Sequence, residues 1–184
     1  MKMRIISGEL KGRKISVPDS KEIRPTTDRV RETLFNILNN KIDFSDRKVL
    51  DLYAGSGSLG FECLSRGAFS VHFVERNFKI YKNLLENINS LGVAEKCKIY
   101  KMEALKFSQL SKSEDYDLIL ADPPFFKDDI YNVVVNLINN KYFAVDGFMI
   151  IERSVQTKEK DIENFKTEPF KIIGDSCLYE IIPK

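Results

Sequence analysis

The sequence predicts an α/β fold in which a doubly wound, mostly parallel sheet carries helices on both faces. Two observations predict it. From residue 48 onward, short apolar runs of strand length alternate with segments whose apolar residues recur at helical spacing, which is typical of parallel strands joined by helices. Residues 170–182 instead contain two strand-like runs joined by a short turn, which predicts an antiparallel hairpin at a sheet edge.

An N-terminal extension precedes this alternation. It begins with a predicted β-hairpin, whose strands Arg4–Ser7 and Arg13–Val17 are joined through a turn between Gly8 and Gly12 and end at Pro18. The length of 184 residues suits one domain and is too short for two of ordinary size. We therefore expect residues 1–41 to pack on a core formed by residues 42–184.

A helix is predicted after the turn Arg24–Asp28, because Thr27 or Asp28 offers an N-cap. Asn39–Lys41 ends it. Its apolar residues recur on one helix face and are Val30, Leu34, Ile37 and Leu38.

The predicted parallel strands are apolar runs, as expected of strands buried on both faces. They are Lys48–Tyr53, Ser70–Val74, Lys98–Met102, Tyr116–Ala121 and Phe148–Ile151. Helical spacing is clearest in Asn77–Leu91 and Ile130–Ile138, and the terminal hairpin is predicted from Phe170–Ile173 and Cys177–Ile182.

Composition excludes several classes of protein. Hydrophobic residues make up 43% and charged residues 30% of the chain, which argues against disorder. No stretch approaches the ~18 apolar residues of a membrane span and no export signal is visible, so we expect a cytoplasmic protein. The scattered Cys63, Cys97 and Cys177 fit reduced thiols and argue against a metal site. The single histidine, His72, lies in an apolar run and is expected to be packed in a strand, which argues against hydrolase triads.

The charge distribution is uneven. Residues 1–41 carry a net charge of +5 and the remaining residues −3. A polyanion such as RNA could therefore meet the N-terminal extension, although a solvated basic edge would show the same pattern. The candidate RNA-binding residues are Arg4, Lys11, Arg13, Lys14, Arg24 and Arg29.

Four of the predicted parallel strands run into a carboxylate; these residues are Asp51, Glu75, Glu103 and Asp122. Parallel strands end at one sheet edge, where the ligand crevice of such folds lies. Four carboxylates there would repel one another unless hydrogen-bond donors or a positive charge lay among them. The alternative, that each one caps the next helix, suits Asp51 poorly because three further residues precede any helix.

The first strand leads into a glycine-rich turn, Asp51–Gly60, whose glycines let backbone N–H groups approach a ligand closely. Its G-x-G-x-x-G spacing, with Glu75 20 residues after Gly55, requires a dinucleotide site to be considered. Asp51 at the mouth of the turn disfavours a pyrophosphate. S-adenosylmethionine suits the turn better, because it brings two cationic groups and ribose hydroxyls that Glu75 can bind. Glu103, with Ala104 beside it, would then accept from the adenine amine.

The segment Asp122–Phe125, D-P-P-F, directly follows a predicted buried strand. Its prolines stiffen the chain and hold the Asp122 carboxylate and the Pro123 carbonyl in fixed directions. These two acceptors could take both hydrogens of an exocyclic base amine while Phe125 stacks on the base. Methyl transfer would then be a direct in-line displacement driven by positioning to ~3–3.5 Å. The alternative is a simple strand-terminating turn.

The D-P-P-F segment matches the [DN]PP[FYW] signature of methyltransferases that act on base amines in DNA or RNA. Residues 4–36 and 51–68 resemble the bacterial 16S rRNA guanine-N2 methyltransferases of the RsmD type. The resemblance implies a Rossmann-like class I methyltransferase core, with S-adenosylmethionine as donor. It also implies transfer to the N2 amine of a 16S rRNA guanine, at position 966, in free rRNA, the 30S subunit or an assembly intermediate.

The resemblance also implies residue roles. Asp122, Pro123 and Phe125 would be catalytic, the Arg24–Arg31 block would lie near the methionine end of the cofactor, and the Arg4–Lys14 hairpin would face RNA. The family often has Asp or Asn where this chain has Glu103. The implied cofactor-binding residues are Asp51, Ala54, Gly55, Gly57, Glu75, Arg76, Glu103, Ala104 and Asp122.

Three other functions stay open. An N6-adenine DNA methyltransferase uses the same amine-holding chemistry, although this chain leaves no room for a target-recognition domain. A nicotinamide-dependent oxidoreductase would need a proton donor that the sequence does not offer. In a non-catalytic RNA-binding module, only the basic extension would matter.

Overall fold

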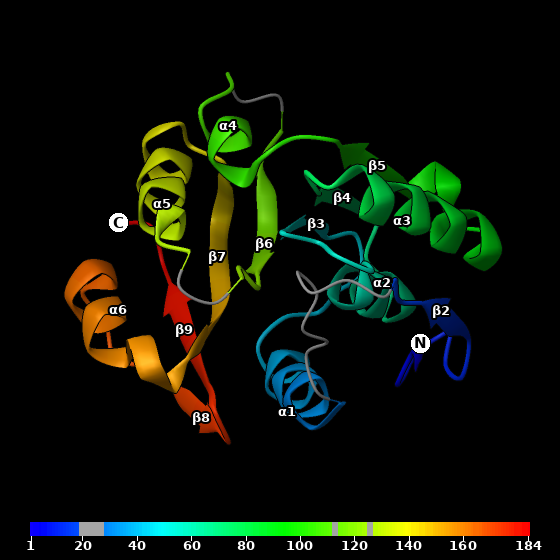
Figure 1. The fold of residues 1–184 in the computed structure, drawn as a ribbon, viewed down its shortest axis with the longest axis horizontal. Helices are drawn as coiled ribbons and strands as arrows, with labels where there is room; N and C mark the ends of the chain where they lie inside the picture. Colours follow the sequence, from blue (N-terminus) through cyan, green and yellow to red (C-terminus); the bar gives the residue numbers. More distant parts are fainter. Residues whose placement is uncertain (19–27, 112–113, 125–126) are drawn as a thin grey trace.

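The computed structural model describes residues 1–18, 28–111, 114–124 and 127–184. Its main feature is a seven-stranded sheet in the order β5-β4-β3-β6-β7-β9-β8 (Figure 1). The first five of these strands are parallel, and β9 runs antiparallel to both β7 and β8. The strands are β3 (Lys48–Leu52), β4 (Ser70–Val74), β5 (Cys97–Tyr100), β6 (Tyr116–Ala121), β7 (Phe143–Ser154), β8 (Lys171–Ile173) and β9 (Ser176–Ile181). The predicted fold class is confirmed.

Helices cover both faces of the sheet because alternate strand residues enter two separate cores. In β3, Val49 packs with the helices α1, α2 and α3, whereas Leu50 and Leu52 pack with α4 and α5 on the other face. The helices are α1 (Asp28–Asn39), α2 (Ser58–Ser65), α3 (Phe78–Leu91), α4 (Ala104–Ser108), α5 (Asp129–Asn139) and α6 (Lys158–Phe165). No helix in the described ranges is long and apolar enough to cross a membrane.

The N-terminal hairpin is displaced from its predicted position. Its strands are β1 (Lys2–Arg4) and β2 (Lys14–Ser16), not Arg4–Ser7 and Arg13–Val17. The reason is a tertiary contact, since the backbone N–H groups of Ile6 and Ser7 donate to the carboxylate of Glu62 in α2 over 2.9 and 3.0 Å. Those two residues are thereby withdrawn from the strand ladder, and the hairpin is tied to α2.

Two further expectations need correction. In α1 the buried face includes Phe35 and Arg31, whereas Ile37 is only partly buried, so apolar spacing identified the helix but not its whole core face. Strand β7 extends beyond the predicted Phe148–Ile151 at both ends, because Phe143 pairs with Tyr116 of β6 and the last residues, including Arg153, pair with β9. Polar side chains there masked the strand in the sequence.

Asn87 connects the hairpin to the glycine-rich turn. This buried residue of α3 accepts from the N–H of Ser16 and donates to the Ser16 carbonyl, each over 2.8 Å. Its side-chain amide also donates to the carbonyl of Ser56 over 3.1 Å. The extension and the turn that follows β3 are therefore held by one side chain.

Candidate active site

The loops after β4, β3 and β6 lie side by side because these strands are neighbours. In the parallel register, Leu52 is opposite Val74 on one side and Ala121 on the other. Each partner directly precedes a predicted site residue, Glu75 or Asp122. The structure thus brings these two carboxylates to the edge that also carries the glycine-rich turn, as the sequence pattern predicts.

Glu75 holds the glycine-rich turn directly. Its carboxylate accepts from the N–H of Gly55 over 3.1 Å and from the N–H of Asn77 over 2.7 Å, and the residue is only 7% exposed. The N-cap of α3 is Asn77, whose side chain accepts from Lys79 and Ile80. Glu75 is therefore not a helix cap, which removes the simpler explanation for its position.

Asp51 lies within β3 and is 2% exposed. Its Oδ2 accepts from the N–H of Gly60 in α2 over 3.0 Å. Burial raises the pKa of Asp51 to about 8, and the nearby Glu75 carboxylate raises it further, while the Gly60 hydrogen bond opposes both. A cation bound beside these two carboxylates would favour the ionised form of Asp51.

The turn between β3 and α2 needs left-handed backbone at several positions. Gly57, at the N-cap of α2, has φ +83°, and a Cβ there would lie 2.5 Å from Cδ1 of Leu84. Tyr53 has φ +57°, a conformation that costs a bulky residue about 1–3 kcal/mol. Ala54, between Tyr53 and Gly55, donates its N–H to the Val74 carbonyl over 3.0 Å. The whole turn is thus fixed against β4.

Tyr53 also joins this turn to the segment that follows the double-proline motif. Its hydroxyl donates to Oδ1 of Asp129, the first residue of α5, over 3.1 Å. Lys127 Nζ lies 3.2 Å from Oδ2 of the same carboxylate and 5.8 Å from the centre of the Tyr53 ring. The sequence did not predict this connection, because no local pattern relates residues that lie about 75 positions apart.

The double-proline motif is only partly described. Asp122 is half-buried, Pro123 is buried and Pro124 is exposed. The Pro124 carbonyl accepts from the N–H of Lys127 over 3.1 Å, which closes the turn toward α5. Phe125, the predicted stacking ring, lies outside the described residues.

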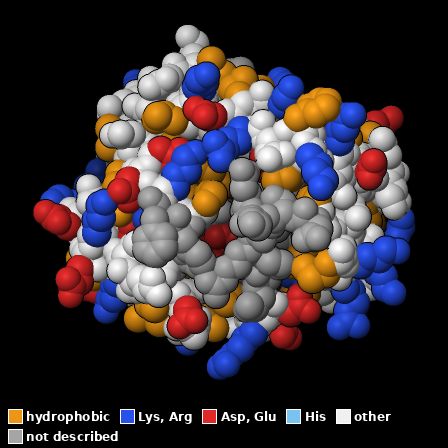
Figure 2. All heavy atoms as spheres, viewed as in Figure 1, with side chains coloured by type: hydrophobic (Ala, Val, Ile, Leu, Met, Phe, Trp, Pro, Cys, Tyr) orange, Lys and Arg blue, Asp and Glu red, His pale blue; other side chains and the backbone are white. Residues whose placement is uncertain are grey.

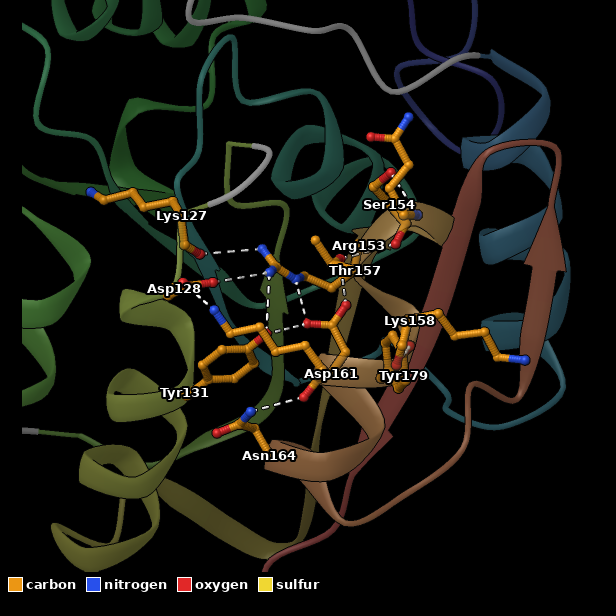
Figure 3. A network of polar contacts seen from close by, with 12 residues as sticks. Lys127, Asp128, Tyr131, Arg153, Ser154, Thr157, Lys158, Asp161, Asn164 and Tyr179 are labelled. Carbon is orange, nitrogen blue, oxygen red and sulfur yellow. Dashed lines mark hydrogen bonds and ion pairs between the residues drawn. The ribbon is translucent and has the colours of Figure 1, made fainter.

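A buried ion pair supports the segment after this motif (Figure 3). Arg153, at the end of β7, donates from Nε to Oδ1 of Asp161 over 2.9 Å, and both side chains are almost fully buried. The Asp161 carboxylate also accepts from the hydroxyls of Tyr131 and Thr157 over 2.6 and 2.7 Å. Arg153 Nη1 reaches the carbonyl of Lys127 over 3.3 Å. The network thus ties β7, α5 and α6 to the chain just beyond the motif.

Comparison with known proteins identifies the family. The sequence model described as "Conserved hypothetical protein 95" matches residues 3–182. "Ribosomal RNA small subunit methyltransferase D" from Escherichia coli (strain K12) is 37% identical over 154 residues, which cover 84% of this chain and 76% of that protein. The chain belongs to this family, the RsmD family.

Two further comparisons cover more of the chain. "Putative rRNA methyltransferase YlbH" from Bacillus subtilis (strain 168) is 31% identical over 178 residues, covering 94% of this chain and 96% of that protein. The solved structure of "Putative methyltransferase yhhF from Escherichia coli" superposes with a TM-score of 0.81 at 30% identity, covering 100% of both chains. Full-length superposition means that this chain has the fold of a methyltransferase family throughout.

The residues that the RsmD resemblance assigns to adenine follow β5, which is an edge strand of the sheet. Glu103 is the N-cap residue of α4 but makes no side-chain cap hydrogen bond. It lies 4.0 Å from Nη1 of Arg76, and both side chains are about half exposed. Ala104 follows as a buried residue of α4. Glu103 and Arg76 thus pair across the loops that follow β5 and β4.

The predicted RNA-binding residues within the described ranges lie on the hairpin and on α1, and Arg4 is opposite Lys14 in the β1–β2 pairing. Arg4, Lys11 and Lys14 are exposed on the hairpin, and Arg29 is exposed on α1. Arg13 donates from Nη2 to the Ser90 carbonyl of α3 over 2.6 Å, so part of its guanidinium serves the fold. Arg24 lies outside the described residues, as does the first half of the Arg24–Arg31 block.

Proposed function

We propose that this chain is an S-adenosylmethionine-dependent methyltransferase that modifies the N2 amine of a guanine in 16S rRNA, at position 966. The names of the RsmD relatives support rRNA methylation, and the D-P-P-F motif supports an exocyclic amine as the target. The observation that carries the proposal is the hydrogen bond from Gly55 to Glu75, with buried Asp51 beside them. The carboxyl groups of Glu75 and Asp51 thus form an acidic cradle beside the glycine-rich turn. This cradle lies next to the strand end that bears Asp122.

The residues present fit a cationic nucleoside. The carboxylate of Glu75 is already oriented by two backbone N–H groups and keeps acceptor capacity for ribose hydroxyls. The pKa of Asp51 is raised by burial, so this carboxylate gains from a positively charged neighbour. Gly55 has nearly open space where a Cβ would stand, so no side chain at this position blocks the approach of a ligand to the turn. When bound, S-adenosylmethionine supplies an activated methyl group.

The chain's own residues would hold the acceptor. The Asp122 carboxylate and the Pro123 carbonyl accept the two hydrogens of the base amine and orient its nitrogen for an in-line displacement. The proton that the methylated amine loses passes to the Asp122 carboxylate or to water, so no stronger base is needed. The Arg153–Asp161 network holds the backbone carbonyl of Lys127, at the start of the described chain that leads into α5.

The test is methyl transfer to defined substrates. Purified protein and isotope-labelled S-adenosylmethionine are incubated with 30S subunits, 16S rRNA or duplex DNA, none of which carries the modification. We expect label in N2-methylguanosine of rRNA, identified by mass spectrometry and mapped to position 966. Label in N6-methyladenine of DNA would favour the second methyltransferase class. Absence of donor binding in a calorimeter, together with measurable NADH binding, would overturn the proposal.

A further inference from the structure

An apolar ring stands exposed at the start of α3. Phe78, the first residue of this helix, is 53% exposed, whereas the apolar side chains that anchor the helix to the core include Ile80, Leu84 and Ile88. The Phe78 ring lies roughly parallel to that of Tyr81, with 6.4 Å between centroids and 17° between planes. Phe78 therefore contributes little to the core and presents an aromatic surface to solvent.

Ammonium groups from two separate segments surround this ring. Lys82 Nζ, one turn along α3, lies 4.6 Å from the Phe78 centroid, and Lys101 Nζ, in the loop after β5, lies 4.7 Å from it. Lys79 is exposed on the same turn of α3. Among the described residues, no carboxylate lies within ion-pair distance of Lys79, Lys82 or Lys101. These three ammonium groups are thus not tied up in ion pairs with the described carboxylates.

The position of this patch relates it to the proposed active site. Phe78 follows Glu75 by three residues, and Lys101 precedes Glu103 by two. The patch therefore begins at the edge of the sheet where the acidic cradle lies. Figure 2 shows Lys and Arg side chains interspersed with hydrophobic ones over the region that α3 and β5 occupy in Figure 1.

We propose that Phe78, Lys79, Lys82 and Lys101 bind a single-stranded segment of the RNA substrate outside the target guanine. An aromatic platform flanked by cations suits single-stranded RNA, because a base stacks on the ring while ammonium groups pair with phosphates. Lys82 and Lys101 can leave the ring for phosphates as a base takes their place. This inference rests on the proposed function for the identity of the RNA. The surface is separate from the N-terminal hairpin, the RNA-binding region that the sequence predicts.

The experiment measures RNA binding without methyl transfer. Full-length protein is titrated into a fluorescently labelled single-stranded RNA oligonucleotide of mixed sequence, and anisotropy is read at several salt concentrations. We expect Phe78→Ala to weaken binding roughly 5- to 100-fold, because one stacked base is lost. Phe78→Tyr keeps the ring and should restore most of the affinity. Phe78→Leu keeps apolar bulk without a ring, so it separates loss of stacking from loss of folding.

Matched controls remove the same groups elsewhere. Phe69→Ala deletes a ring that is 59% exposed at the opposite end of β4 and should leave the RNA affinity unchanged. Lys82→Ala with Lys101→Ala should reduce the slope of log K against log salt by up to ~1.4, at about 0.7 for each single-strand phosphate contact. Lys171→Ala with Lys184→Ala removes equal charge from β8 and from the C-terminus and should leave the slope unchanged.

Three results would overturn the proposal. The first is wild-type RNA affinity in both Phe78→Ala and the Lys82–Lys101 double variant. The second is an equal loss in the Phe69→Ala control. The third concerns polyglutamate as a competitor at equal ionic strength. If polyglutamate competes as strongly as unlabelled RNA, and if its binding is also lost in Phe78→Ala, the surface would be assigned to an acidic polypeptide. Because no step requires methyl transfer, an inactive protein that still binds RNA through Phe78 would contradict only the proposed function.

Discussion

The backbone N–H of Gly55 donates to Oε2 of Glu75 over 3.1 Å, which joins the loops that follow β3 and β4. Glu75 is thus oriented before any ligand arrives, and its other oxygen is held by Asn77. Preorganisation of this kind lowers the cost of ordering the site when a ligand binds.

Glu75→Ala should therefore weaken S-adenosylmethionine binding roughly 10- to 100-fold, as expected for loss of hydrogen bonds to a charged group. Glu75→Gln keeps one acceptor oxygen and should lose less. Isothermal titration calorimetry checks both variants, with thermal unfolding as the control for folding. Wild-type affinity in Glu75→Ala would remove this carboxylate from the cofactor site.

Asp51 should make the stability of the ligand-free protein depend on pH. The pKa of Asp51 is about 8 in the folded state and 3.8 at its ordinary value. Between these two pH values the folded state therefore keeps a proton on Asp51 that the unfolded state has lost. Stability contributed by the protonated form is present below about pH 4 and falls as pH rises toward 8. Asp51→Asn, which keeps an acceptor for Gly60, should flatten this dependence in urea unfolding at pH 5 to 8.

Binding of the donor should show the opposite trend at the same residue. Because the ionised form of Asp51 attracts a cation, wild-type affinity for S-adenosylmethionine should rise between pH 6 and 8, and Asp51→Asn should bind weakly with little dependence on pH. Calorimetric measurement of donor affinity against pH, in the wild-type protein and in Asp51→Asn, tests this prediction. A rise of equal size in both would assign the effect to another group.

Asp122→Ala should lower methyl transfer by about 10³-fold or more, since the amine would lose the acceptor that holds it. Donor affinity should stay close to that of the wild-type protein. Single-turnover transfer to 30S subunits and calorimetric donor binding separate these two effects. Transfer at the wild-type rate would contradict the amine-holding mechanism.

Breaking the Arg153–Asp161 pair should destabilise the fold. Arg153→Met leaves the Asp161 carboxylate buried without its guanidinium partner, at a cost of about 3–5 kcal/mol in unfolding free energy. Adding Asp161→Asn to the same protein should recover part of that loss. Urea denaturation of both single variants and the double variant measures the coupling, and a cost below about 1 kcal/mol for Arg153→Met would show that the pair is not stabilising.

Removing positive charge from the hairpin should weaken RNA binding. Lys14→Ala with Arg13→Ala should lower the salt slope by up to ~0.9 for each lost phosphate contact on duplex-like RNA. Arg13→Ala alone also removes the hydrogen bond to Ser90, so its thermal stability is measured in parallel. An unchanged slope would exclude the hairpin from the RNA interface.

Local patterns predicted much of this molecule. Apolar runs and helical spacing depend on which residues face a core, so they located β3, β4, β5, β6, α3 and α5 within about two residues, whereas only the centre of β7 was predicted. The position of Asp51 inside an apolar strand, with Glu75 and Asp122 directly after others, was enough to predict acidic strand ends at one edge. Parallel topology then brings those ends together, because every parallel strand points the same way.

Only the tertiary structure decided the contacts between distant segments. The displacement of β1 by Glu62, the Tyr53–Asp129 hydrogen bond and the Arg153–Asp161 pair join residues whose separation in the chain follows no period. The contact between Lys101 and Phe78 is likewise a product of the tertiary structure, because Lys101 looks in the sequence like an ordinary surface lysine. Periodicity reports which side of an element is buried, whereas a pairing between side chains depends on which elements meet, and that is settled only when the sheet order and the helix positions are known.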